Sequence, residues 1–175
     1  MQTTDATLVE LDGGLMTVTL NRPKRKNAIN ADNWADLGVV LTEAEMNPEV
    51  RAVVLTGADG NFSAGADLAG DGPNTGMTGR GVQPILAEMR IVGDLIGRLQ
   101  KLPKPTIAAV DGVAVGVGLG LVLACDLVLA SDRARFSQIF VKRGLALDGG
   151  TSWTLPHQIG LRRAKQMAFL SLIHI

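Results

Sequence analysis

Two glycine-rich stretches of this chain each lie where a strand is followed by a helix. The first is Phe62-Ser63-Ala64-Gly65-Ala66-Asp67-Leu68, and the second is the stretch 111–120, DGVAVGVGLG. Small residues let a backbone approach a ligand closely, and the first N–H groups of a helix have no partner within that helix. Such amides, together with the helix dipole, favour a negatively charged oxygen. Two loops of this kind could direct two donors at one oxyanion, as acyl or enolate chemistry requires, although small residues also simply pack helices against a sheet.

Few side chains in this sequence have the chemistry or the spacing to bind a metal ion or a dinucleotide. The chain has two histidines, His157 and His174, and one cysteine, Cys125. Their spacing matches no metal site, and Cys125 follows an apolar stretch, so we expect this thiol to be buried and inert. The glycines at 116, 118 and 120 precede Leu121, where the dinucleotide-binding fingerprint needs a further glycine. The sequence therefore predicts neither a metal ion nor a separate cofactor.

Strands that alternate with helices must position the two loops. We expect strands at 7–11 and 15–20, joined by the turn Asp12-Gly13-Gly14, and further strands at 52–56, 106–110 and 127–130. We expect helices from the N-cap Asn30 to Asn47-Pro48, at 82–102, at about 116–124, at 152–159 and at 162–170. This order predicts an α/β fold with right-handed crossovers, in one domain that covers residues 1–175. The range 70–81 contains five glycines, so we expect it to be mobile.

The composition argues against several classes of partner. Lys plus Arg and Asp plus Glu are both 17, so the formal net charge is zero, which argues against a dedicated nucleic-acid or membrane-surface binder. The N-terminus has no signal-peptide pattern, and the longest apolar stretch is too short to span a bilayer. With one cysteine, no disulfide can form within the chain. We therefore expect a soluble, cytoplasmic protein.

Four segments, in order, resemble the signatures of the crotonase (enoyl-CoA hydratase/isomerase) superfamily. They are LNRPKRKNAIN at 20–30, FSAGADL at 62–68, the range 108–126, and RFSQ at 135–138 followed by Gly144-Leu145 and Gly149-Gly150-Thr151. The resemblance covers the chain from Leu8 to Leu170. It implies the crotonase-like ββα superhelix spiral fold, and an acyl-CoA thioester as substrate.

The end of the sequence departs from this pattern after Leu170. The tail Ser171-Leu172-Ile173-His174-Ile175 does not follow the family, whose members continue into a helical region that closes the active site and supports trimer packing. The resemblance implies that this C-terminal region is missing here. Full-length relatives are expected to form homotrimers or hexamers, and the assembly of this shorter chain is left open.

The resemblance also assigns roles to individual residues. The two oxyanion donors would be the backbone N–H groups of Ala66 and Val117, where relatives usually have glycine at the second position. Lys24 and Arg25 lie where relatives contact the CoA phosphates. The remaining residues expected around the substrate are Ala28, Ala64, Asp67, Leu68, Val113 and Phe140, of which Asp67 is also expected to fix its own loop.

The departures from the family bear on which reaction is catalysed. The two glutamates of family hydratases would fall on Gly120 and Phe140, and neither residue can accept a proton. Asp148 resembles the catalytic aspartate of some crotonase-fold isomerases and aryl-CoA dehalogenases. The structural alternative is an aspartate that caps the helix near Thr151 and Ser152.

The leading hypothesis is an acyl-CoA double-bond isomerase that holds an enolate in the oxyanion hole and uses Asp148 as acid and base. One alternative is an atypical enoyl-CoA hydratase or an aryl-CoA dehalogenase-like enzyme. Another is a serine hydrolase that uses Ser63 with His157, for which no Gly-x-Ser-x-Gly elbow is present. The last is an acyl-CoA-binding protein without catalysis.

Overall fold

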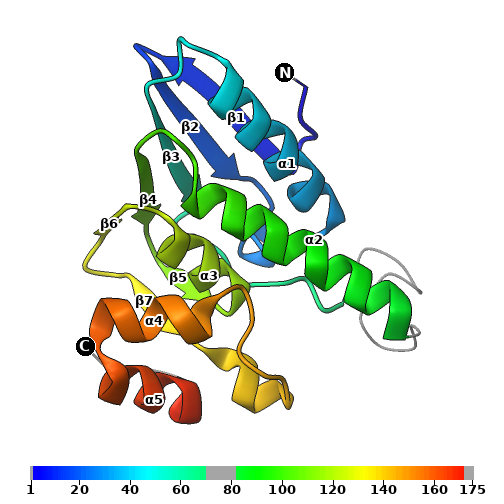
Figure 1. Cartoon of the computed structure of the whole chain (residues 1–175), viewed down its shortest axis with the longest axis vertical. Coiled ribbons are helices and arrows are strands. Elements are labelled where there is room, and N and C mark those ends of the chain that lie inside the picture. The colour runs from blue at the N-terminus through cyan, green and yellow to red at the C-terminus, as the bar shows by residue number, and fades with distance from the viewer. Residues whose placement is uncertain (1, 70–81, 172–175) are drawn as a thin grey trace.

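The computed structural model describes residues 2–69 and 82–171. The range 70–81, which we expected to be mobile, lies outside these residues. A five-stranded sheet has the order β1-β2-β3-β4-β6 (Figure 1). Its strands are β1 (Thr7–Asp12), β2 (Leu15–Leu20), β3 (Ala52–Gly57), β4 (Thr106–Val110) and β6 (Leu127–Ala130). The predicted hairpin forms the one antiparallel pair of this sheet, and the other pairs are parallel.

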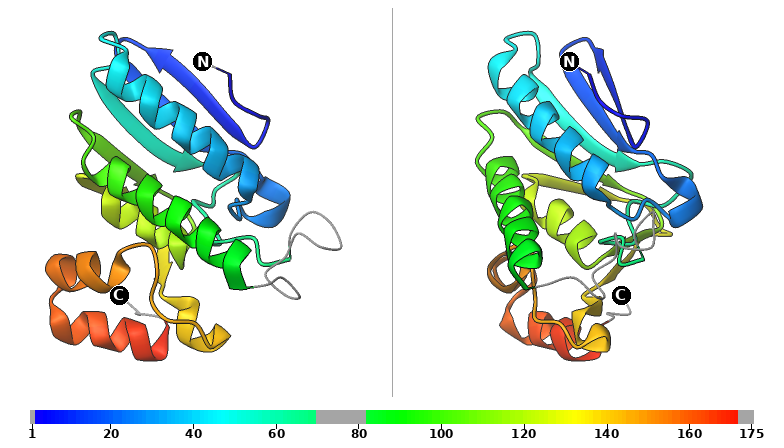
Figure 2. Two further views of the ribbon diagram at one scale, coloured as in Figure 1. Left: turned by 45° about the vertical axis from the view of Figure 1, so that its right-hand side comes forward. Right: turned by 90° about the vertical axis from the view of Figure 1, so that its right-hand side faces the viewer.

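Three helices cover one face of this sheet. They are α1 (Ala31–Met46), α2 (Val82–Gln100) and α3 (Val117–Ala124). Figure 2 shows α1 and α2 side by side against the sheet. The row Val18, Leu55 and Ala108, which crosses three paired strands, is buried beneath the helices. The alternating burial of β2, β3 and β4 thus produces one apolar layer.

Helix α1 begins where its capping residues predict. The side chain of Asn30 accepts from the Asn33 amide at 3.1 Å, and the Asn33 side chain accepts from the Asn30 amide at 3.2 Å. This reciprocal pair satisfies two donors that a helix start would otherwise leave free. Helix α2 ends at Gln100, two residues before its predicted end and three before Pro103.

A second, two-stranded sheet was missed by the sequence patterns. Strand β5 (Val113–Val115) pairs in parallel with β7 (Arg135–Ser137). Each strand has only three residues, which is too short for a period-two pattern to be recognised. This small sheet carries the second glycine-rich loop, so its position determines where the two loops meet.

The rest of the chain forms short helices at the end of the molecule opposite to β1 (Figure 1). They are α4 (Thr151–Ile159) and α5 (Leu161–Leu170), and the 3-10 turn η2 (Ile139–Arg143) contacts α5. A second 3-10 turn, η1 (Pro23–Arg25), follows β2. Both α-helices lie within one residue of their predicted starts. None of the helices described here combines the length and the hydropathy needed to cross a membrane.

Candidate active site

The two glycine-rich loops are joined directly by backbone hydrogen bonds. The Ser63 amide donates to the Val113 carbonyl at 2.8 Å, and the Val115 amide donates to the Ser63 carbonyl at 3.0 Å. Gly65 follows with φ of +92°, and a Cβ atom there would lie 2.7 Å from the Val115 carbonyl oxygen. Only glycine fits this conformation and this approach, so Gly65 sets the spacing between the loops.

Ser63 and Gly118 hold the start of α3 against the first loop. The fully buried Ser63 hydroxyl donates to the Asn27 carbonyl at 2.8 Å and accepts from the Gly65 amide at 3.1 Å. A Cβ atom on Gly118 would lie 2.8 Å from the Ser63 Cβ and 2.9 Å from its Oγ. The small residues of both loops therefore serve close packing, and that packing brings the first turn of α3 to the first loop.

The predicted oxyanion donors are both unused by the described part of the chain. A parallel bridge joins Ile29 to Ala66, with Ile29 donating to the Gly65 carbonyl and Asp67 donating to the Ile29 carbonyl. In this geometry the Ala66 N–H points away from Ile29. Val117 is the first residue of α3, where an amide has no acceptor one turn earlier. Neither N–H has a hydrogen-bond acceptor within residues 2–69 and 82–171.

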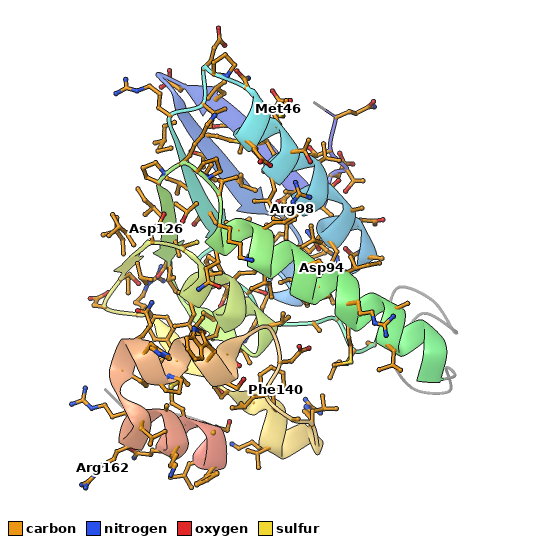
Figure 3. All side chains as sticks on the ribbon, viewed as in Figure 1. Met46, Asp94, Arg98, Asp126, Phe140 and Arg162 are labelled. Atoms are coloured by element: carbon orange, nitrogen blue, oxygen red, sulfur yellow. The ribbon has the colours of Figure 1, made fainter. Side chains whose placement is uncertain are left out.

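Phe140 lies next to Gly116, the residue before the proposed donor Val117. It belongs to η2 and is buried (Figure 3). A Cβ atom on Gly116, the N-cap of α3, would lie 3.8 Å from the Phe140 Cζ and 3.6 Å from the Ile139 Cγ2. One of the two positions where family hydratases carry glutamate is therefore an apolar wall beside the start of α3.

Asp148 is half-buried on the loop that precedes α4. Its Oδ1 accepts from the Gly149 amide at 2.6 Å, and its carbonyl accepts from the Thr151 hydroxyl at 2.7 Å. The N-cap of α4 is Gly150, and no side chain caps this helix. The alternative in which the Asp148 carboxylate caps α4 is therefore wrong: the carboxylate turns back onto Gly149.

The Asp148 loop rests on α3 through glycine contacts. A Cβ atom on Gly149 would lie 3.4 Å from the Val117 Cγ2, and one on Gly120 would lie 3.2 Å from the Gly149 carbonyl oxygen. The Val117 side chain, only 4% exposed, thus packs against this loop. The fold thus packs Gly149, the neighbour of Asp148, against Val117 and Gly120 of α3, although the two segments are separated in the sequence.

The basic loop after β2 is tied to the first oxyanion loop by an ion pair that the sequence patterns missed. Arg22 lies 2.9 Å from the Asp67 Oδ2 and donates to the Ala28 carbonyl at 2.6 Å. The Asp67 side chain is 4% exposed, so its carboxylate faces Arg22. The two residues are 45 positions apart in the chain, so no local pattern in the sequence signals this pairing.

The other residues expected around the substrate surround this junction. Lys24 and Arg25 are exposed on η1, and Leu68 is exposed beyond Asp67. Ala28, Ala64 and Val113 are half-buried. Asn27, which the sequence patterns also missed, is buried with φ of +54° and donates to the Ala58 and Asn61 carbonyls at 2.8 and 2.6 Å.

The geometry excludes a Ser63–His157 pair. The Ser63 hydroxyl is fully buried and hydrogen-bonded on both sides, as described above. His157 is exposed on α4, with its Nδ1 2.6 Å from the Trp153 carbonyl and its ring centroid 4.1 Å from that of Trp153, the two planes being tilted by 37°. The expectation of a buried, inert cysteine is supported, because burial raises the pKa of Cys125 to about 12.

Asp126 is structural, as its position after α3 indicates (Figure 3). Its Oδ2 accepts from the Thr106 amide and hydroxyl at 2.8 and 2.9 Å, so it ties the start of β6 to β4. Within the described residues, no three His, Cys, Asp or Glu side chains form a group that could hold a metal ion.

The structure thus combines a mostly parallel α/β core with two hydrogen-bonded loops, and the amides of Ala66 and Val117 in these loops have no acceptor among the described residues. The chain belongs to the enoyl-CoA hydratase/isomerase family, whose model matches residues 10–172. The predicted fold is confirmed by an enoyl-CoA hydratase from Polaromonas sp. JS666, with a TM-score of 0.85 and 32% identity. The match covers 94% of this chain and 63% of that one.

Relatives in this family carry several different names. A 1,2-epoxyphenylacetyl-CoA isomerase of Escherichia coli (strain K12) is 41% identical over 93% of this chain. A 4-chlorobenzoyl coenzyme A dehalogenase-2 of Arthrobacter sp is 37% identical over 90% of this chain. The chain spans 62% of the length of the first relative and 56% of the second. Membership of the family therefore leaves the individual reaction open.

Proposed function

We propose that this chain acts on an acyl-CoA thioester as a double-bond isomerase, with Asp148 as acid and base. The observation that carries the proposal is the packing of the Asp148 loop on Val117, whose amide has no acceptor in the part of the chain that the structure describes. The loop that carries this carboxylate thus packs on the element that would bind the enolate. Gly120 and Phe140, which occupy the positions of the hydratase glutamates, can move no proton.

In the proposed reaction the thioester carbonyl oxygen lies between the N–H groups of Ala66 and Val117. The Asp148 carboxylate removes a proton from carbon 2 of a 3-enoyl-CoA, and the electron pair moves toward the carbonyl oxygen as an enolate. The protonated Asp148 then returns the proton to carbon 4, while the double bond moves from carbons 3–4 to carbons 2–3. The amides stabilise the charge that develops on oxygen, and no other reactant is needed.

The rest of the acyl-CoA would be held around the same junction. Lys24 and Arg25 are exposed cations on η1 and suit the CoA phosphates. Ala28, Ala64 and Leu68 would lie along the pantetheine arm, while Val113 and Phe140 would contact the acyl group. Asp67 would act indirectly, because its ion pair with Arg22 fixes the loop that carries the Ala66 donor.

The test is Asp148→Asn, assayed with a panel of 3-enoyl-CoA thioesters. We expect turnover to fall by about 10²-fold or more, because the amide cannot take the proton, with acyl-CoA affinity retained. Loss of deuterium incorporation from deuterated water should accompany the loss of turnover. A variant that isomerises at a near wild-type rate would show that Asp148 has no acid/base role.

A second candidate reaction uses Asp148 as a nucleophile. The similarity to a protein named as a 4-chlorobenzoyl coenzyme A dehalogenase motivates it. The carboxylate would add to the chlorine-bearing ring carbon, chloride would leave, and water would hydrolyse the resulting aryl ester. A trapped aspartyl adduct on an aryl-CoA would favour this reaction. Water addition without an adduct would favour the atypical hydratase, and acyl-CoA binding without proton exchange would favour a non-catalytic binder.

A further inference from the structure

We propose that Gly120 is a positioning residue, whose missing side chain allows the Asp148 loop to seat on α3 and so fixes the Asp148 carboxylate relative to the Val117 amide. This inference rests on the proposed function, because it concerns the same carboxylate. The proposed function uses Gly120 only as a position without the hydratase glutamate. The inference gives Gly120 a steric role of its own.

The contact at Gly120 is tight and involves backbone. A Cβ atom on Gly120 would lie 3.2 Å from the Gly149 carbonyl oxygen and 3.6 Å from the Gly149 Cα. Ordinary contacts of a Cβ atom begin at about 3.4 Å, so even alanine would require a shift of a few tenths of an ångström. Because the opposing atom belongs to the main chain, no side-chain rotation can relieve the contact.

The contact is transmitted to Asp148 through one residue. Gly149 presents its carbonyl to Gly120 and donates its N–H to the Asp148 Oδ1 at 2.6 Å. A displacement of Gly149 therefore moves the donor that orients the carboxylate. A misplacement of about 1 Å at a reacting group can cost about 10²-fold in rate, so smaller shifts are also measurable.

The loop has little room to absorb the displacement. A Cβ atom on Gly149, which has φ of +61°, would lie 3.1 Å from the Ile96 Cδ1 and 3.4 Å from the Val117 Cγ2. On its other side, Thr151 is fully buried and holds the Asp148 carbonyl through its hydroxyl at 2.7 Å. Helices α2, α3 and α4 thus surround the loop.

A longer side chain at position 120 starts from the same Cβ atom, so it requires at least the same displacement of the Gly149 carbonyl. A glutamate at this position, as in the family hydratases that this chain resembles, would therefore shift the loop that carries Asp148.

The test compares Gly120→Ala with Gly97→Ala. Gly97 lies on α2, and a Cβ atom there would have no neighbour within 4 Å. We expect Gly120→Ala to lower kcat by about 10-fold or more while KM changes by less than about threefold, because binding is retained and the base is misplaced. Gly97→Ala should retain the wild-type kcat.

Hydrogen exchange at the Gly149 amide, followed by NMR, provides a second measurement that needs no turnover. We expect exchange to be about 10-fold faster or more in Gly120→Ala than in the wild type or Gly97→Ala, because the bond to Oδ1 is weakened. Unchanged exchange and unchanged kcat in Gly120→Ala would overturn the inference. Asp148→Asn distinguishes failure of this inference from failure of the proposed function. If Asp148→Asn is inactive while Gly120→Ala has wild-type kcat and exchange, only the positioning role of Gly120 is wrong.

If Gly120→Ala yields no folded protein, Thr151→Val tests the same seat from its other side. Valine keeps the γ-methyl group and removes only the hydroxyl that holds the Asp148 carbonyl. We expect the same pattern, with a lower kcat, a little-changed KM and faster exchange at Gly149. Wild-type values for kcat and exchange in Thr151→Val would show that the loop needs no such fixing.

Discussion

Gly118 lies against Ser63 so closely that a Cβ atom on Gly118 would stand 2.8 Å from the Ser63 Cβ. This contact joins the start of α3 to the loop that carries Ala66. The two amides of the candidate oxyanion hole come from segments about fifty positions apart in the chain, and this glycine–serine contact is one reason that they meet.

Replacement of Gly118 by alanine should therefore destabilise the fold. We expect the free energy of unfolding to fall by about 1–3 kcal/mol, the usual cost of overpacking a buried contact. Urea denaturation of the variant and the wild type measures the change. The matched control is Gly93→Ala, because a Cβ atom on Gly93 would meet nothing within 4 Å. A Gly118→Ala variant as stable as this control would contradict the tight contact.

Val117→Pro should remove one oxyanion donor and leave the helix in place. Val117 is the first residue of α3, where proline is favoured because the N–H has no helical acceptor. We expect kcat to fall by about 10²–10³-fold, the usual effect of deleting one such donor. Val117→Ala keeps the amide and shortens only the side chain, so its kcat should fall much less. Equal losses in the two variants would point to the side chain instead of the amide.

Neutralising the cations of η1 should weaken substrate binding without slowing the reaction. Lys24 and Arg25 are exposed and far in sequence from Asp148, so the Lys24→Gln/Arg25→Gln double variant should raise KM by about 5–30-fold with kcat little changed. The wild-type KM should also rise with ionic strength, and this rise should be smaller in the variant. An unchanged KM would place the CoA phosphates elsewhere.

Cys125 should resist thiol reagents while the chain is folded. Its pKa is raised to about 12 by burial, so the reactive thiolate is scarce at pH 8. We expect slow modification by a thiol reagent at pH 8 and fast modification in urea. A folded pKa above the unfolded one also means that Cys125 contributes stability below pH 9 that is lost as the pH rises toward 12. Rapid modification of the folded chain would contradict the burial.

The strongest sequence patterns correctly predicted helices and strands, whereas two short strands were missed for a physical reason. The capping pair Asn30 and Asn33 and the alternation of β2 are local signals, so the start of α1 and the hairpin were predicted correctly. Strands β5 and β7 were missed because they are defined by their hydrogen-bonded pairing with each other, and their own sequences show no recognisable alternation.

The same contrast applies to the site. The glycine-rich patterns marked two loops that the structure joins by backbone hydrogen bonds, while the catalytic role that the resemblance gives to Asp148 stays a prediction. The ion pair between Arg22 and Asp67 joins residues 45 positions apart, so no local pattern could predict it. The seat of Gly149 on Gly120 depends on how α4 packs on α3, which only the folded chain defines.

Both proposed donors are main-chain N–H groups, and this affects how such a protein can evolve. Every residue except proline carries that group, so a substitution at Ala66 or Val117 by any residue other than proline keeps the N–H donor. Side chains around them, such as those at 140 and 148, can change without loss of the donors, because the groups that stabilise the charge belong to the main chain. A lineage can therefore exchange its acid/base residues one at a time, and acquire a new reaction, without first losing the capacity to stabilise an enolate.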